Sequence, residues 1–318
     1  MRLTRSRPRR SFVLALLVVM VGCARGASTA PGTSESPASA GGSFPVTITD
    51  DDGVAVTLEA APERIVTFAP SATEIVFALG LGDRLVGVAG AFDDYPAAAK
   101  GIDEIGGAGD FGVDPNIEKV VSLRPDLFLT ISGGDRWKER LRDLGVPVFT
   151  TNSTDLADVF HDIETVGRLT GTIGAADAIV AKMQAEAADI EARVAGDPAV
   201  RCFYEVYYPP LTTVGPDTFI GDLLSLAGCR SVSAQAKSDY PQWSVEDLVR
   251  QDPEVYLVSS ESGASPKAVA SRPGFDAVKA IAAGRVVPVD ADLVSRPGPR
   301  VVDGLRLLAR ALHPEAFG

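Results

Sequence analysis

Short apolar runs and amphipathic segments alternate along most of this chain. Apolar runs at 64–68, 127–131 and 146–150 have the length and the β-branched content of buried strands. The segments 117–123 and 136–144 place apolar residues at helical spacing. Strands that alternate with helices predict a mainly parallel sheet, because each crossover helix returns the chain to the same end of the sheet.

The middle of the chain lacks strand patterns. Residues 155–195 contain two long helical stretches, which a Gly-Thr-Ile-Gly segment at 171–174 separates. The second stretch, 175–194, is rich in Ala, Glu, Asp, Lys and Met, and as a helix it would be roughly 30 Å long. That length is enough to bridge two domains. The alternation of strands and helices resumes at Val200 and continues to a closing helix at 299–312.

An internal repeat indicates that the two halves of the chain are similar lobes. Residues 117–121 and 125–129 align with 245–249 and 253–257 at one constant offset, and in each copy a proline separates a short helix from a buried strand. The sequence therefore predicts an α/β fold of two Rossmann-like α/β lobes joined by one long backbone helix, with the ligand cleft between the lobes.

The N-terminal segment has the composition of an export signal followed by a tether. Residues 1–10 carry five arginines, residues 11–21 are apolar, and small residues lie just before Cys23. The apolar run is shorter than the roughly 20 residues that span a bilayer. Its ending resembles the bacterial lipoprotein box, in which the cysteine becomes the lipidated N-terminus; an ordinary secretory signal with an incidental cysteine is the alternative. Residues 24–42 are almost all Ala, Gly, Ser, Thr and Pro, which is typical of a flexible tether.

These patterns divide the chain into five predicted parts. They are a lipoprotein signal peptide (1–22), a flexible tether (23–43), an N-terminal α/β lobe with an entry hairpin (44–171), the backbone helix (172–196) and a C-terminal α/β lobe (197–318). The entry hairpin is predicted from alternating residues at 46–49 and 54–58 around an Asp-Asp-Gly turn.

The charge of the chain restricts its partners. There are 30 basic and 42 acidic residues, a formal net charge of -12, and removal of residues 1–22 with their five arginines leaves 25 basic and 42 acidic residues, or -17. Such a surface repels phosphate, so DNA and RNA are not expected partners. It does not favour an anionic membrane surface either, so the lipid on Cys23 is expected to hold the protein at the outer face of the cell membrane.

Cysteines and histidines are few. After Cys23 only Cys202 and Cys229 remain, and in an exported protein they predict a disulfide, with two unrelated free thiols as the alternative. His161 and His313 are far apart, and no His/Cys/Asp cluster has metal-ligand spacing, so neither a metal site nor a resident cofactor is expected. Catalysis has little support, since no nucleophile elbow, phosphate loop or nucleophile–His pair is present.

Several short motifs occur together in an order that resembles one family. In chain order they are 64–74 (RIVTFAPSATE), Gly87-Val88, Asp94-Tyr95-Pro96, Asn116-Ile117-Glu118, Arg124-Pro125-Asp126, Gly133-Gly134, Pro241-Gln242 and Arg296-Pro297-Gly298-Pro299-Arg300. The set covers nearly all of 62–313 and resembles the class III solute-binding proteins of ABC importers, the helical-backbone receptors for ferric siderophores, haem and cobalamin. The Asp-Tyr-Pro and Pro-Gln-x-Ser segments are most similar to the cobalamin-binding branch.

The resemblance implies a role for two acidic residues at equivalent repeat positions. Glu118 and Glu246 each lie two residues after a predicted N-cap, where an acid stabilises a helix by about 0.3–1 kcal/mol. In the family, the matching glutamates pair with arginines of the membrane permease. An ABC permease dimer with its ATPase is therefore the expected partner, and simple stabilisation of two helix starts is the alternative.

Aromatic residues gather where predicted strands end and loops begin. Ligands of open α/β sheets bind outside such strand ends, and flat rings suit the faces and edges of a macrocycle. The residues expected to contact the ligand are Phe92, Tyr95, Phe111, Tyr207, Tyr208, Tyr240 and Trp243, together with Arg296. For each ring the alternative is packing in the core, and for Arg296 it is capping of the last helix.

The expected function is the capture of a metal chelate by a monomeric, exported lipoprotein that delivers it to an ABC permease. A metal already enclosed by a chelator needs no protein ligand, which agrees with the absence of metal-ligand spacing. A cobalamin-type corrinoid is the ligand that the resemblance favours. A ferric-siderophore or haem receptor is the alternative within the binding class, and an exported enzyme or a ligand sensor on the same scaffold is the more distant one.

Overall fold

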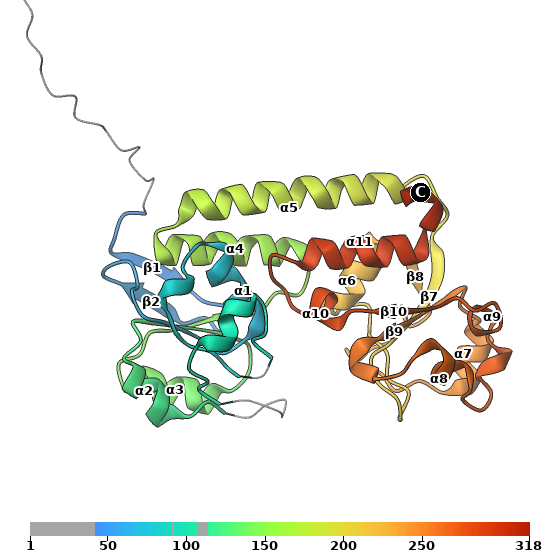
Figure 1. Cartoon of the computed structure of the whole chain (residues 1–318), viewed down its shortest axis with the longest axis horizontal. Helices are drawn as coiled ribbons and strands as arrows, with labels where there is room; N and C mark the ends of the chain where they lie inside the picture. Colours follow the sequence, from blue (N-terminus) through green and yellow to red (C-terminus); the bar gives the residue numbers. More distant parts are fainter. Residues whose placement is uncertain (1–41, 91, 107–113) are drawn as a thin grey trace, which may run out of the picture. The chain divides into compact units, whose positions relative to one another are not determined.

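The computed structural model describes residues 42–90, 92–106 and 114–318. Within these ranges a two-stranded hairpin and two four-stranded parallel sheets follow one another along the chain, with helices around them (Figure 1). The predicted signal peptide, lipidated Cys23 and most of the tether lie outside the described residues, and so does Phe111.

The first lobe is built on a sheet with the strand order β4-β3-β5-β6, in which every pairing is parallel. Its elements are β1 (Val46–Thr49), β2 (Ala55–Leu58), β3 (Ile65–Thr67), α1 (Pro70–Ala78), β4 (Leu85–Gly87), α2 (Ile117–Leu123), β5 (Leu127–Ile131), α3 (Asp135–Asp143) and β6 (Val148–Thr151). The central strands β3 and β5 are buried apart from Ile131, because helices cover both faces of a parallel sheet.

The second lobe has the sheet order β10-β9-β7-β8, again with parallel pairings throughout. Its elements are β7 (Val200–Glu205), α6 (Phe219–Leu226), β8 (Cys229–Ser231), α7 (Val245–Gln251), β9 (Val255–Ser259), α8 (Pro266–Ala270), α9 (Lys279–Ala282), β10 (Val286–Val289), α10 (Ala291–Val294) and α11 (Val301–Leu312). Short 3-10 helices lie at Gly82–Arg84, Ala97–Gly101, Ser260–Ser262, Phe275–Ala277 and Pro314–Phe317.

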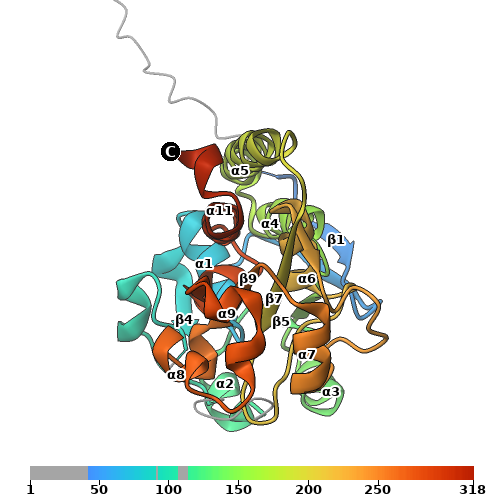
Figure 2. The same ribbon diagram turned by 90° about the vertical axis from the view of Figure 1, so that its right-hand side faces the viewer.

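Two helices, α4 (Leu156–Thr170) and α5 (Ile173–Val194), separate the two sheets in the chain. Gly171, with a φ of 73°, ends α4 and lets the chain reverse into α5. The 22 residues of α5 span about 33 Å. One face of α5 packs on α4 of the first lobe and on α11 of the second, and Figure 2 shows the three helices nearly end-on. The long helix that the sequence predicts is therefore one member of a three-helix layer.

The internal repeat is present in the structure. The orders β4-β3-β5-β6 and β8-β7-β9-β10 match strand for strand. The N-caps of α2 and α7 are Asn116 and Ser244, whose side chains each accept a hydrogen bond from a backbone N–H, and their C-caps are Arg124 and Asp252, which have φ values of 49° and 45°. The prediction of two α/β lobes is confirmed. The exact domain boundaries and the ligand cleft stay predictions.

A disulfide joins Cys202 of β7 to Cys229 of β8, with 5.8 Å between their Cα atoms. The two strands are parallel neighbours, and β8 lies at the edge of its sheet. The bridge that the sequence predicts is therefore confirmed, and it fastens a three-residue edge strand to the centre of the second lobe.

The entry hairpin is held on the first lobe by ion pairs. Lys138 of α3 is fully buried, and its Nζ lies 2.8 Å from the carboxylate of Asp52. The Oγ1 of Thr150 on β6 donates to the same carboxylate at 2.9 Å. Although partial burial acts in the opposite direction, hydrogen bonds from Lys138 and Thr150 hold the pKa of Asp52 below its ordinary value. The turn of the hairpin thus neutralises a cation inside the lobe.

Predicted and observed elements differ mostly at their ends. The first strand of the second lobe begins at Val200, where the sequence predicts that the alternation resumes, and the last helix begins at Val301 instead of Pro299. The strand β8 and the helix α10 were not predicted, because three or four residues carry too little periodicity to be recognised. Among the described helices, none is long and apolar enough to cross a membrane.

Candidate functional site

Aromatic side chains follow the carboxyl ends of strands in both sheets. Phe92 and Tyr95 lie in the loop after β4, Tyr207 lies directly after β7, and Tyr240 lies in the loop after β8. These four rings are 45%, 46%, 50% and 57% exposed. Large exposed rings gathered in one kind of position mark a binding surface more often than scattered ones do. Exposed rings therefore lie at strand ends in both lobes.

The two other predicted rings in the described part of the chain are more buried. Tyr208 and Trp243 both pack against the core of the second lobe. The ring of Tyr208 meets Phe275 edge-on at 5.9 Å between centroids. The indole nitrogen of Trp243 is buried and has no hydrogen-bond partner among the described residues. Contact of these two rings with a ligand remains a prediction, and packing is what the structure shows for them.

One exposed apolar residue at a strand end was not among the predicted site residues. Ile131 is the last residue of β5 and is 44% exposed, although the four preceding residues of the strand are buried. Ile131 is still paired with Thr151 of β6, and the only sequence signal for a strand end there is the pair Gly133 and Gly134, which begins the next turn almost at once. Ile131 adds an aliphatic side chain to the same edge of the first sheet.

Arg296 contacts carboxylates of both lobes. Its guanidinium lies 2.6 Å from Asp292, 3.3 Å from Asp94 and 3.6 Å from Glu74. Asp94 and Glu74 belong to the first lobe, so Arg296 connects the loop before α11 to the loop after β4 and to α1. Its charge is directed to the protein's own carboxylates, and a direct contact with a ligand stays a prediction.

A second arginine of the same loop reaches the first lobe. Arg300 donates two hydrogen bonds to the buried carboxylate of Glu74, at 2.6 and 2.9 Å. Its guanidinium also lies 3.9 Å from the ring centre of Tyr95, which is a cation–π contact. The hydrogen bonds to Glu74 raise the pKa of Arg300 above its ordinary value. The side chains of both lobes thus meet at one exposed tyrosine.

The second lobe holds a related cluster that the sequence did not predict. Glu205, the last residue of β7, is fully buried and accepts two hydrogen bonds from Arg272, at 2.5 and 3.0 Å. It also accepts hydrogen bonds from the hydroxyl groups of Tyr256 and Ser262. Although burial acts in the opposite direction, these bonds hold the pKa of Glu205 below its ordinary value. The Arg272 guanidinium lies 4.0 Å from the ring centre of Tyr208.

A hollow of about 340 Å³ lies beside the loop after β4. Asp93, Asp94, Lys100 and Glu104 are among its lining residues, so carboxylates outnumber the single lysine there. Burial raises the pKa of Asp93, against hydrogen bonds from Thr73 and the N–H of Gly90. In the part of the chain that the structure describes, no group of three or more His, Cys, Asp and Glu residues is arranged to hold a metal ion.

Glu118 and Glu246 occupy equivalent exposed positions. Each is the second residue of its helix, α2 or α7. The side chains of the N-cap residues Asn116 and Ser244 each accept a hydrogen bond of 2.9 Å from the backbone N–H three residues later. The repeat thus places one acidic group on each lobe. A contact with a permease stays a prediction.

Two α/β lobes of parallel strands, joined by a helical layer and carrying exposed rings at their strand ends, define a solute-binding protein. Comparison with known families agrees, because the periplasmic binding protein family matches residues 65–293. That match covers well over half of the chain, so the chain belongs to the periplasmic binding protein family. The predicted family is confirmed.

Three individual proteins are similar to this chain over most of its length. An uncharacterised ABC transporter substrate-binding lipoprotein of Bacillus subtilis, YvrC, is 34% identical over 86% of this chain and 87% of its own length. A cobalamin-binding protein of Halobacterium salinarum is 33% identical over 97% of this chain and 85% of its own length. The crystal structure of the periplasmic vitamin B12 binding protein BtuF of Vibrio cholerae has a TM-score of 0.70 and 26% identity, covering 80% of this chain and 98% of that one.

Proposed function

We propose that this protein captures a cobalamin-type corrinoid outside the cell and delivers it to the permease of an ABC importer. The observation that carries the proposal is the set of exposed rings at the strand ends of both lobes: Phe92, Tyr95, Tyr207 and Tyr240. A corrin ring has two broad apolar faces and a rim of amides, so stacked rings with hydroxyl groups suit it. The relatives named for cobalamin and vitamin B12 support this ligand.

The chelate is the cargo and not a resident cofactor. A corrinoid encloses its cobalt, so the protein need not supply a metal ligand. Nor does binding require catalysis, and the family consists of binding proteins. Delivery requires a permease dimer and its ATPase, to which the exposed Glu118 and Glu246, one on each lobe, would present matching acidic contacts. Charge pairs of this kind mainly set orientation and encounter rate.

Attachment to the outer face of the membrane belongs to the same proposal. Cys23 would carry the lipid, and the name of the relative YvrC as a lipoprotein supports this. Changing Cys23 to Ala should move the protein from the membrane fraction to a soluble fraction or the medium. A variant that stays in the membrane fraction would contradict lipid attachment at Cys23.

Ligand identity is tested by absorbance. The purified protein is incubated separately with cyanocobalamin, haemin, a ferric hydroxamate and a ferric catecholate, and is then desalted. We expect cyanocobalamin to elute with the protein at about one equivalent. Retention of haemin or of a ferric siderophore in its place would overturn the corrinoid proposal and leave the binding-protein class intact.

Substitution of the exposed tyrosines tests whether the strand-end rings contact the ligand. Tyr207→Ala and Tyr240→Ala should each weaken cyanocobalamin binding about tenfold or more, since loss of a stacked ring typically costs 1–3 kcal/mol. Leu144→Ala is the matched control, because Leu144 is a similarly exposed apolar residue at the end of α3. Equal effects of all three variants would show that the strand-end rings are not the contact surface.

A further inference from the structure

Two predicted ligand-contact tyrosines, one in each lobe, are backed by the same arrangement of charges. In the first lobe, Tyr95 lies over Arg300, whose guanidinium makes two hydrogen bonds to Glu74. In the second lobe, Tyr208 lies over Arg272, whose guanidinium makes two hydrogen bonds to Glu205. The distances from guanidinium to ring centre are 3.9 and 4.0 Å.

Both glutamates are inaccessible to solvent. The side chain of Glu74 is 2% exposed and that of Glu205 is fully buried, whereas their arginines are 20% and 10% exposed. A two-hydrogen-bond pair in such a place fixes the plane of the guanidinium and cancels its charge locally. Each tyrosine therefore rests on a rigid, neutralised support.

The third arginine near the rings is neutralised as well. Arg296 has three carboxylates within 3.6 Å, one of which is Glu74. The arginine charges beside the predicted contact rings are thus directed to the protein's own carboxylates.

We propose that the Glu74–Arg300 and Glu205–Arg272 pairs are positioning and specificity-determining pairs: they hold Tyr95 and Tyr208 in place and mask the arginine charges, so that the site favours chelates whose ring rim bears neutral amides over chelates whose rim bears carboxylates. The inference rests on the proposed function, because it takes the strand-end rings as the ligand surface. It adds the property by which one class of metal chelate is chosen over another.

Glu74 offers the sharpest test. A ligand stacked on the free face of Tyr95 would lie about 7 Å from the Arg300 guanidinium, which is the measured 3.9 Å plus a stacking distance of about 3.5 Å. Glu74→Gln leaves the shape of the side chain and releases the charge of Arg300. At this distance an unmasked charge near a partly desolvated site should change the affinity of a carboxylate-bearing ligand about tenfold.

The measurement is a spectroscopic titration of full-length protein with two probes: cyanocobalamin, whose corrin rim bears neutral amides, and haemin, whose porphyrin rim bears two carboxylates. Glu74→Gln should raise the haemin-to-cyanocobalamin affinity ratio about tenfold at low salt. Arg300→Gln removes the cation and leaves Glu74 in place, so it should lower the same ratio. Opposite shifts of the ratio cannot result from a loss of structure common to both variants.

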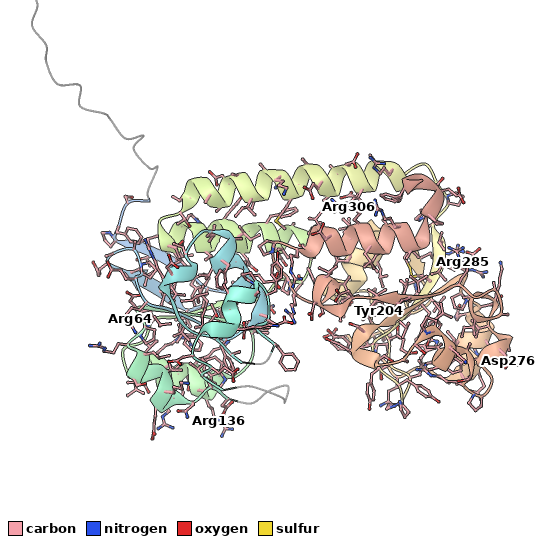
Figure 3. All side chains as sticks on the ribbon, in the orientation of Figure 1. Arg64, Arg136, Tyr204, Asp276, Arg285 and Arg306 are labelled. Carbon is pink, nitrogen blue, oxygen red and sulfur yellow. A yellow bond between two sulfur atoms is a disulfide. The ribbon has the colours of Figure 1, made fainter. Side chains whose placement is uncertain are left out.

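A control variant separates local charge from net charge. Glu186 on α5 pairs with Arg306 on α11 at 2.9 Å, and Arg306 extends from α11 toward α5 (Figure 3). Glu186→Gln makes the same change in net charge away from the strand ends and should leave the ratio unchanged. Circular dichroism and the thermal midpoint identify any variant that does not fold.

The outcomes distinguish the inference from the proposed function. The wild-type preference for cyanocobalamin or haemin tests the proposed function, and the shift of the ratio in the variants tests the charge masking, whichever probe the wild type prefers. Equal losses of affinity for both probes in Glu74→Gln and Arg300→Gln, or no shift in either, would overturn the inference. So would a shift in Glu186→Gln as large as that in Glu74→Gln.

Discussion

Opening the disulfide of the second lobe should destabilise the protein by a calculable amount. Cys202 and Cys229 are 27 residues apart in sequence. In the loop-closure description, a bridge across a loop of that size stabilises the fold by about 3.5 kcal/mol through the entropy of the unfolded chain. For a protein of this size the loss corresponds to a fall of about 6 °C in the thermal midpoint.

The loss should be concentrated at one edge of the second sheet. The strand β8 has three residues and pairs only with β7, so little besides the bridge and the end of α6 fixes its position. When the bridge is open, local unfolding of the α6–β8 segment requires less free energy than unfolding of the whole lobe. Amide exchange at 229–231 should therefore accelerate more than exchange at β9 in the sheet centre.

The assay compares three samples by urea unfolding: oxidised protein, protein held reduced, and a Cys202→Ala/Cys229→Ala variant. Reduction should lower the midpoint through the chain-entropy effect alone. The double variant should lower it slightly more, because the fully buried Cys202 also loses the packing of its sulfur atom. If reduced and oxidised protein unfold at the same urea concentration, the bridge is absent from the protein in solution or contributes no stability, and the reasoning fails.

Three further predictions follow from other parts of the structure. Changing both Glu118 and Glu246 to Arg should abolish uptake in reconstituted vesicles and leave the ligand affinity measured by calorimetry unchanged. Normal uptake by this variant would show that the two glutamates only stabilise the starts of their helices. Lys138→Met removes the cation of a buried ion pair and should destabilise the protein by about 3 kcal/mol in urea unfolding. Lys182→Met, which loses only a surface pair, should change it by less than about 0.5 kcal/mol, and similar effects of the two would argue against the buried pair. Burial raises the pKa of Asp162 to about 7. The contribution of its protonated carboxyl group to the free energy of unfolding is therefore fully present below 3.8, the pKa in the unfolded chain, and is lost as the pH rises through 7. Asp162→Asn should therefore be more stable than the wild type, by at most about 4 kcal/mol at pH 8 and by less at pH 5; a pH-independent difference would contradict this.

Periodicity was sufficient to predict the regular elements because each one depends on its own residues. The run 127–131 became β5 with the predicted bounds, and 117–123 became α2. Because 245–249 and 253–257 repeat the pattern of the first lobe, the same reasoning predicted α7 and β9. The Cys202–Cys229 bridge was predictable because these are the only cysteines left after the lipoprotein box.

The charge pairs behind the tyrosines were not predictable in this way. Glu74 and Arg300 are 226 residues apart, and Glu205 and Arg272 are 67 apart. Neither pair has a local spacing that would distinguish it from ordinary surface charges. Their meeting depends on where strand ends of separate elements arrive, and that is decided by packing of the whole fold.

For Arg296 the sequence predicted the position of the residue but not the partners of its charge. Its position in the Arg-Pro-Gly-Pro-Arg loop predicted a place near the ligand, and the loop does lie against the first lobe, since a Cβ on Gly298 would come within 3.7 Å of the Glu74 carboxylate. The sequence could not show that three carboxylates would surround the guanidinium. Position was encoded locally, whereas the partner of the charge was not.

Glu74 connects the two lobes. It belongs to α1 of the first lobe, and both arginines that contact it belong to the loop before α11 of the second. Moving the lobes apart there would leave a nearly inaccessible carboxylate without its partners, which is strongly unfavourable. The same movement would withdraw Arg300 from Tyr95 and release the ring. In the proposed site, a ligand that stacks on Tyr95 would favour the arrangement in which the arginine charge is masked, so affinity, charge selection and lobe separation would depend on one set of contacts.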